Sequence, residues 1–214
     1  DAGYTALHAA VLRGDVELVT ALLAYGADPN PQLKRGTPAR RVSADWTLSH
    51  NMIGATPFWL AARFREPAMM RALAEGGADP LVSKGGATAV IAALQGGTGR
   101  GRFGVPRGDR AEEARLTVEA VEQAIEAGAD VDETNNSGDT AMHIAASRGL
   151  DDIISLLAAR GATLDVRNER GQTPLSVAMA GPQGVAALYN PGGGRPTTVA
   201  LLRELGATDE GTPR

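Results

Sequence analysis

Three histidines are the side chains of this sequence best suited to acid–base chemistry or metal binding, because it contains no cysteine. The absence of cysteine excludes disulfides, thiolate metal sites and cysteine nucleophiles. His8 and His143 each stand three residues after a threonine in closely similar segments, whereas His50 stands alone near Asp45. A lone loop histidine is usually solvated, so we expect no metal site here.

A glycine-rich segment, Gly99–Gly104, matches the GxGxxG string of dinucleotide-binding loops. That chemistry needs a strand before the string and a helix N-terminus directly after it, whose amides hold the pyrophosphate. Here a short predicted helix precedes the string, and the next helix begins only near Ala111. We therefore interpret it as a flexible loop and expect no cofactor. Anion binding remains an alternative for the arginines around Phe103, namely Arg100, Arg102, Arg107 and Arg110.

The acidic residues follow helical spacing and lie beside no catalytic partner. Glu119, Glu122 and Glu126 share one predicted helix face, and Arg115 stands four residues before Glu119, which is typical of surface ion pairs. The Asp151–Asp152 pair begins a predicted helix, where negative charge is favoured. No nucleophile and base can be assembled from these residues, so we expect no enzyme.

A repeated segment determines where all of these residues lie. Gly-Tyr-Thr-Ala-Leu-His-Ala-Ala, from Gly3, returns from Gly138 as Gly-Asp-Thr-Ala-Met-His-Ile-Ala-Ala. Looser copies begin at Gly54, Gly86 and Gly171, and Gly138 and Gly171 are 33 positions apart. Each copy predicts a short helix that starts after the threonine, a return helix with apolar residues at helical spacing, and a closing glycine.

The 33-residue period and the Thr-Ala-Leu-His-Ala-Ala signature resemble the ankyrin repeat over nearly the whole chain. The resemblance implies an all-α ankyrin-repeat solenoid, with about five pairs of antiparallel helices joined by finger turns. It also implies that His8 and His143 tie neighbouring turns together by hydrogen bonds. At about 10 Å per helix layer, these two histidines lie too far apart to share a metal. The expected repeats are 1–30, 54–84, 85–132, 133–165 and 166–208.

Three insertions interrupt the period, at about 31–53, 98–110 and 182–196. They are rich in Pro, Gly and Arg, which is typical of loops, and the first two each carry a net charge of +3. We expect an ankyrin-repeat domain over 1–208 and a disordered tail over 209–214. Because the first repeat begins within a finger and shows no polar cap, we also expect further repeats or another domain before Asp1.

The register of the resemblance directs the last turn of each first helix, and the finger turns, toward the concave side. Apolar side chains beside arginines are typical of binding hot spots. Two questions stay open: Leu12 and Phe64 are either exposed anchors or covered by the first insertion, and Arg40 and Arg41 either contact a partner or pair internally. The candidate partner-binding residues are Leu12, Arg13, Arg40, Arg41, Arg63, Phe64, Ser147, Arg148 and Arg170.

These features predict a non-catalytic, monomeric module that binds a protein partner through the concave face and the insertion loops. A net charge of −4 argues against nucleic acid, and the longest uncharged run is too rich in Gly and Pro to insert in a membrane. One alternative is an intramolecular scaffold or spacer for another domain of a longer exported bacterial chain. Another is anion or small-ligand binding by the Arg-rich loops.

The first insertion carries a narrower resemblance. Thr37–Asp45, followed by Gly54–Ala62, is similar to a bacterial subgroup of ankyrin arrays, some of them exported and some part of larger chains. The resemblance favours an exported or periplasmic protein over a cytoplasmic one and leaves the compartment open.

Overall fold

The computed structural model describes residues 3–35, 52–82, 84, 86–96, 109–180 and 194–208, except for the side chain of Arg110. This part contains ten helices and no strand, so the expected all-α fold class is confirmed. The chain divides into two compact units, unit 1 (Asp1–Ala129) and unit 2 (Asp130–Arg214). Each unit is described by itself.

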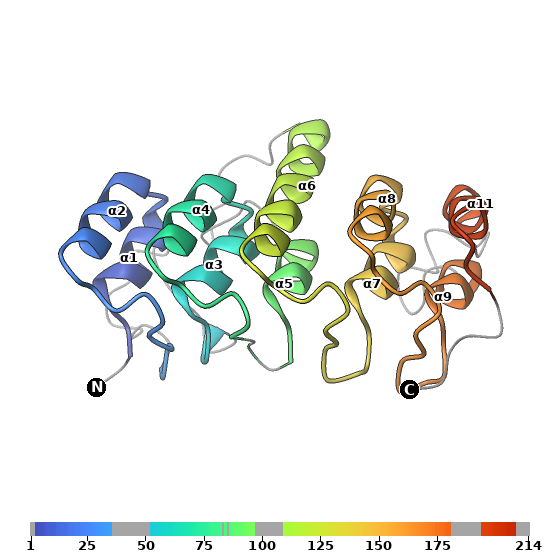
Figure 1. The fold of residues 1–214 in the computed structure, drawn as a ribbon, viewed down its shortest axis with the longest axis horizontal. Helices are drawn as coiled ribbons and strands as arrows, with labels where there is room; N and C mark the ends of the chain where they lie inside the picture. Colours follow the sequence, from blue (N-terminus) through green and yellow to red (C-terminus); the bar gives the residue numbers. More distant parts are fainter. Residues whose placement is uncertain are drawn as a thin grey trace. The chain divides into compact units, whose positions relative to one another are not determined.

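Unit 1 consists of two layers of helices (Figure 1). The inner helices α1, α3 and α5 pack side by side in one layer, and the outer helices α2, α4 and α6 form the other. Each inner helix also packs on the outer helix that follows it in the chain. The bounds are α1 Ala6–Arg13, α2 Val16–Ala24, α3 Pro57–Phe64, α4 Pro67–Glu75, α5 Ala89–Gln95 and α6 Arg110–Glu126.

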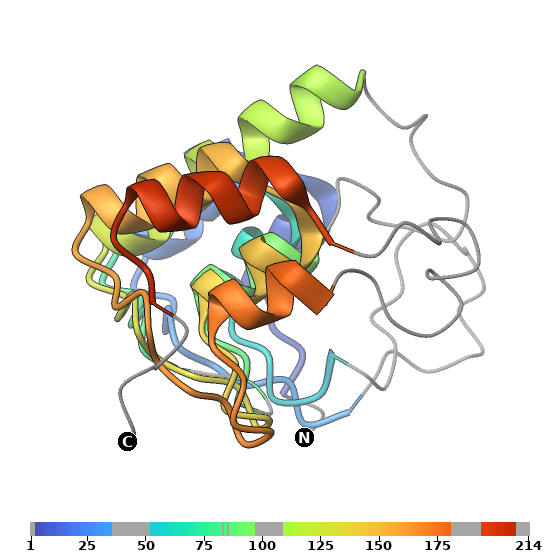
Figure 2. The same ribbon diagram turned by 90° about the vertical axis from the view of Figure 1, so that its right-hand side faces the viewer.

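Unit 2 repeats this arrangement with two helix pairs. The inner helices are α7 (Ala141–Arg148) and α9 (Pro174–Ala180), and the outer helices are α8 (Asp151–Ala159) and α11 (Pro196–Glu204). Helix α7 packs on α8 and α9, and α11 packs on α8 and α9. Figure 2 shows α11, in red, alongside α9, in orange.

Threonines start the inner helices. The hydroxyl oxygens of Thr5, Thr56, Thr88 and Thr140 each accept the backbone N–H of the third residue of the helix, at 3.2–3.5 Å. Such a cap contributes about 1 kcal/mol to stability. The position of these threonines in each sequence copy therefore sets where every one of these helices begins.

Small residues let the inner helices approach each other closely. The Ala61–Ala62, Ala92–Ala93 and Ala145–Ala146 pairs have no exposed surface. At the end of α5 the backbones are close, since a Cβ added to Gly96 would lie 1.9 Å from the carbonyl oxygen of Arg63. Any larger residue at Gly96 would therefore force α3 and α5 apart.

One hydrogen bond recurs between neighbouring repeats. The imidazoles of His8 and His143 bond the carbonyl oxygens of Ala55 (3.2 Å) and Gln172 (2.9 Å), which confirms the expected role of both histidines. Each acceptor immediately precedes the capping threonine of the next inner helix. In α3 the same position holds Trp59, whose indole N–H donates to the carbonyl of Ala87 (2.8 Å).

The finger turns close with one hydrogen-bond pattern. The backbone N–H of Asn135 donates to the carbonyl of Asp139, and that of Asn168 to the carbonyl of Gln172, both at 3.0 Å. Leu33 donates in the same way to Ala55, also at 3.0 Å, although its partner is 22 positions later. The first insertion therefore leaves and rejoins the fold at a closed finger base.

A second polar link joins the loops that follow the outer helices. The amide oxygen of Asn30 accepts the backbone N–H of Asp79 (2.7 Å). In unit 2, the carboxylate of Asp132 accepts the backbone N–H and the hydroxyl of Thr163, and that of Asp165 does the same with Thr208. These acidic side chains therefore serve the stacking of repeats.

We predict that Trp59→Phe lowers the free energy of unfolding by about 1–3 kcal/mol, because the carbonyl of Ala87 keeps only the backbone N–H of Lys84 as a donor and the smaller buried ring leaves a cavity. Urea unfolding followed by far-UV circular dichroism measures this. The control is Tyr25→Phe, which removes a hydroxyl from a side chain that is 93% exposed and should cost less than about 0.5 kcal/mol. Equal losses in the two variants would contradict the prediction.

Candidate functional site

The two predicted apolar anchors are not available to a partner. Leu12 is 1% exposed and Phe64 is 5% exposed, so the alternative of exposed anchors is wrong. Helix α3 packs on α1, α4 and α5, and Arg63 is the only residue of this helix that is not buried. The last apolar residues of α1 and α3 therefore belong to the core, whereas Arg13 and Arg63 of the same turns reach the surface.

Several predicted residues lie outside the described part of the chain. They are Arg40 and Arg41 with their possible partner Asp45, His50, and the glycine loop with Arg100, Arg102 and Arg107. Partner contact or internal pairing of Arg40 and Arg41, and anion binding by the loop arginines, therefore stay predictions.

In unit 1 the remaining candidates lie beside aromatic rings. Arg63 lies over the ring of Trp59, at 6.0 Å from its centroid, and Lys84 of the next finger lies over the same ring at 5.4 Å. The ring of Tyr4 stacks on that of His8, with centroids 6.1 Å apart. Burial raises the pKa of Tyr4, while the nearby charge of Arg13 opposes that shift. Arg13 itself is exposed at the end of α1.

In unit 2 the candidates lie in the last turn of α7 and in the next finger. Arg148 and Arg170 are exposed. Ser147 is half-buried, and its hydroxyl donates to the carbonyl of Ile144 (2.9 Å). Its own carbonyl accepts from the guanidinium of Arg195 (2.7 Å), so Ser147 has a structural role.

Two arginines that are close to the candidates serve the fold instead. Arg65 is only 6% exposed, and its guanidinium donates to the carbonyls of Ala93 (3.1 Å) and Gly96 (2.7 Å) at the end of α5. It ends α3 in a left-handed conformation (φ 56°), where glycine stands in α1 and α7. Arg195 serves the end of α7 in the same manner. A cation at a helix C-terminus compensates its partial negative charge.

His8 is used as a neutral hydrogen-bonding group. Nδ1 of His8 accepts the backbone N–H of Thr5 (3.3 Å), so the proton of the neutral ring is on Nε2, which donates to Ala55. Burial lowers the pKa of His8 below its ordinary value of 6.5. Among the described residues, no cluster of histidine and carboxylate side chains is placed to hold a metal ion.

The acidic residues follow the expected helical pairing. The guanidinium of Arg115 pairs with Glu119 and also with Glu112, at 2.6 Å from the latter. Asp151 lies at the start of α8 and accepts a hydrogen bond from the hydroxyl of Thr198 in α11 (2.6 Å). The carboxylates of Glu112, Glu119 and Asp151 therefore take part in contacts that stabilise the helices.

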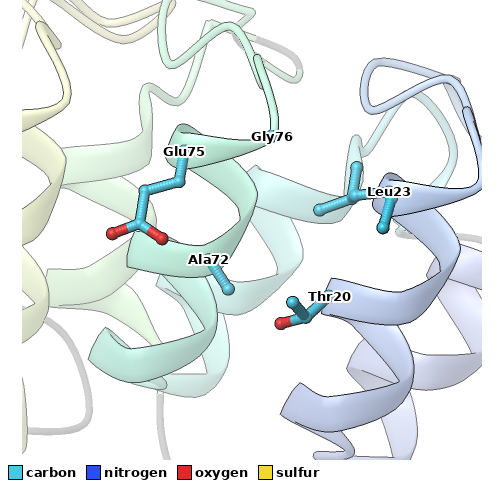
Figure 3. A pocket seen from close by; sticks show the side chains of 6 residues that line it. Thr20, Leu23, Ala72, Glu75 and Gly76 are labelled. Carbon is cyan, nitrogen blue, oxygen red and sulfur yellow. The ribbon is translucent and has the colours of Figure 1, made fainter.

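A hollow of about 310 Å³ lies between α2 and α4 in unit 1. In Figure 3, Thr20 and Leu23 of α2 face Ala72 of α4, while the carboxylate of Glu75 points away from them. The lining has a single charged group and no arrangement of polar groups directed at one point, so it does not resemble a catalytic pocket. Within the described ranges, no helix is both long and apolar enough to cross a membrane.

Helix pairs stacked through repeated caps, finger turns and inter-repeat hydrogen bonds define a repeat protein with a surface suited to binding other proteins. Comparison with protein families gives the same result. A model described as ankyrin repeats, in three copies, matches residues 111–198, and one described as ankyrin repeat matches residues 2–33. The chain belongs to the ankyrin-repeat family.

Among curated proteins, the chain is similar to two mammalian ankyrin-repeat proteins. It is 36% identical over 152 residues to human ankyrin repeat and SOCS box protein 18, which covers 64% of this chain and 33% of the relative. It is 29% identical over 194 residues to mouse ankyrin repeat and SOCS box protein 16, with 83% and 40% covered. The chain thus spans less than half the length of these relatives. The similarity of the first insertion to a bacterial subgroup stays a prediction.

We predict that the stability contributed by His8 is present above about pH 6.5 and is lost as the pH falls, since the unfolded state takes up the proton first. At about pH 7.5, His8→Gln should cost about 1–3 kcal/mol in urea unfolding. Near pH 5.5 the difference in unfolding free energy between His8→Gln and the wild type should narrow, because the wild-type protein must then release the proton of His8 in order to fold. A difference that stays constant or widens would contradict the role assigned to the neutral ring.

Proposed function

We propose that this chain is a non-catalytic module that binds a protein partner through its finger turns and the last turns of its inner helices. Ankyrin-repeat proteins generally mediate protein–protein interactions and are typically not enzymes. The observation that carries the proposal is that arginines remain exposed on inner helices whose other residues are mostly buried. Arg13 ends α1 and Arg148 ends α7 in this way.

Within each unit, the surface suits recognition because its scaffold is rigid. Caps, inter-repeat hydrogen bonds and an alanine-rich core hold the helices that present Arg13, Arg63 and Arg148. A preorganised surface loses little conformational freedom on binding. The proposal includes Arg170 in its finger, and the insertion loops with Arg40 and Arg41, within a binding domain over 1–208.

A second candidate is an intramolecular scaffold that docks another domain of a longer polypeptide. The relatives favour it, because the matched repeats cover 33% and 40% of their lengths and both are also named for a SOCS box. In this case the same surface would contact a segment of its own chain. In the complete gene product, crosslinkers placed on the finger turns and the last turns of the inner helices would then join these positions to that segment. The crosslinks would form at protein concentrations too low for any intermolecular product.

The proposal predicts that Arg13→Glu combined with Arg148→Glu reduces crosslinked capture of a protein partner from an extract of the source organism. Each reversal should weaken binding about fivefold, which corresponds to about 1 kcal/mol. Quantitative mass spectrometry of the captured proteins measures the loss. The matched control reverses two exposed outer-helix arginines, Arg71→Glu and Arg203→Glu, and should keep the partner. Capture that survives the first pair, or is lost equally with both pairs, would overturn the proposal.

A further inference from the structure

Unit 1 separates its charges by layer. We call the described parts of its fingers and inner helices, residues 3–13, 33–35, 52–65, 84 and 86–96, the basic layer. The basic layer contains no aspartate or glutamate. Leaving aside His8, all of its ionisable side chains of basic or acidic type are cations, namely Arg13, Lys34, Arg35, Arg63, Arg65 and Lys84.

The acidic residues of unit 1 lie in the other layer, on the outer helices and the loops that join them. That layer has three arginines, at positions 71, 110 and 115, against a much larger number of acids. The acids are Asp15, Glu17, Asp28, Glu66, Glu75, Asp79, Asp109, Glu112, Glu113, Glu119, Glu122 and Glu126. The net charge of −4 of the whole chain therefore hides a positive surface on one side of this unit.

Most cations of the basic layer are positioned at the surface. Arg13, Lys34 and Arg35 are exposed, and Arg63 and Lys84 are half-buried against the ring of Trp59. A cation held over an aromatic ring loses less freedom when it binds an anion than one on a free chain. The Trp59 ring itself is 4% exposed, so it positions the cations and is not itself presented.

We propose that the basic layer of unit 1 binds an acidic, extended segment of the partner protein. This inference rests on the proposed function and adds the chemistry of the partner. Neighbouring inner helices lie about 10 Å apart, so Arg13 of α1 and Arg63 of α3 are offset by about one such step. A polyproline II chain rises about 3.1 Å per residue and returns to the same side every third residue. The segment therefore carries Asp or Glu at about every third position.

A peptide explains this surface better than a nucleic acid does. Single-stranded nucleic acids gain much of their affinity from bases that stack on exposed aromatic rings. In the described basic layer Trp59 is buried beneath Arg63 and Lys84, so the exposed aromatic surface is limited to Tyr4, which is 36% exposed and has one face stacked on His8. Carboxylates need only the cations, which pair with them through charge-assisted hydrogen bonds.

The test is fluorescence anisotropy with a labelled peptide of four Glu-Ser-Pro triplets, which places glutamate at every third position. We expect binding that weakens as NaCl is raised from about 0.05 M to about 0.5 M. The same peptide with glutamine in place of glutamate should bind at least about tenfold more weakly. Equal binding of the two peptides would overturn the proposal, as would tighter binding of a single-stranded oligonucleotide of the same length.

Matched variants locate the site. Arg13→Glu and Arg63→Glu should each weaken binding of the acidic peptide by about threefold to tenfold, whereas Arg71→Glu on the outer helix α4 should change it less than about twofold. Arg63→Gln, which retains polar contacts, tests the same point if the reversal disturbs packing on Trp59. Unchanged affinity in both Arg13 and Arg63 variants would overturn the assignment. If a captured partner binds this surface through a segment without Asp or Glu, the proposed function is supported and only this inference is contradicted.

Discussion

The structure depends on one hydrogen bond, from the third residue of an inner helix to the carbonyl that precedes the next capping threonine. In α1 and α7 a histidine makes it, and the other ring nitrogen of the same histidine accepts the backbone N–H of its own capping threonine. In α3 the donor is Trp59, which keeps the link to Ala87. A single position thus fixes where a helix starts and where the next one stacks. In α5 the same position is Ile91, whose side chain has no N–H, so this side chain does not make the bond.

This link, the threonine caps and the alanine pairs hold the inner helices together. The arginines near the ends of these helices then fall into two groups. Arg65 and Arg195 lie at helix ends and donate to backbone carbonyls, which removes them from recognition. Arg13 and Arg148 end their helices at the surface. The outer helices and loops collect the acids of unit 1, and part of these acids caps helices or pairs with Arg115. The difference between the two layers, more than the net charge, determines which partner the unit suits.

Much of the fold could be predicted from the sequence, because each repeat is specified locally. The threonines and glycines recur at fixed spacing, the family resemblance implies the histidine bonds, and helical spacing predicts the Arg115–Glu119 pair, all of which the structure confirms. Whether Leu12 and Phe64 are exposed or covered could not be decided from the sequence, since a register along one helix does not count the helices that pack on its other sides. Trp59 and Lys84 were missed as a pair because they come from different repeats. The position of Trp59, three residues after a threonine, was the available signal.

The most direct test of this account is an NMR titration of the labelled protein with the acidic peptide, observing the side-chain N–H groups of arginine and tryptophan. The account predicts shifts at the Nε–H of Arg13 and Arg63. Smaller changes are expected at the Nε1–H of Trp59, which stays bonded to Ala87, and none at Arg71 or Arg115. Shifts confined to the outer-helix arginines, or loss of the Trp59 hydrogen bond on binding, would contradict the claim that a rigid inner layer presents its cations to the partner.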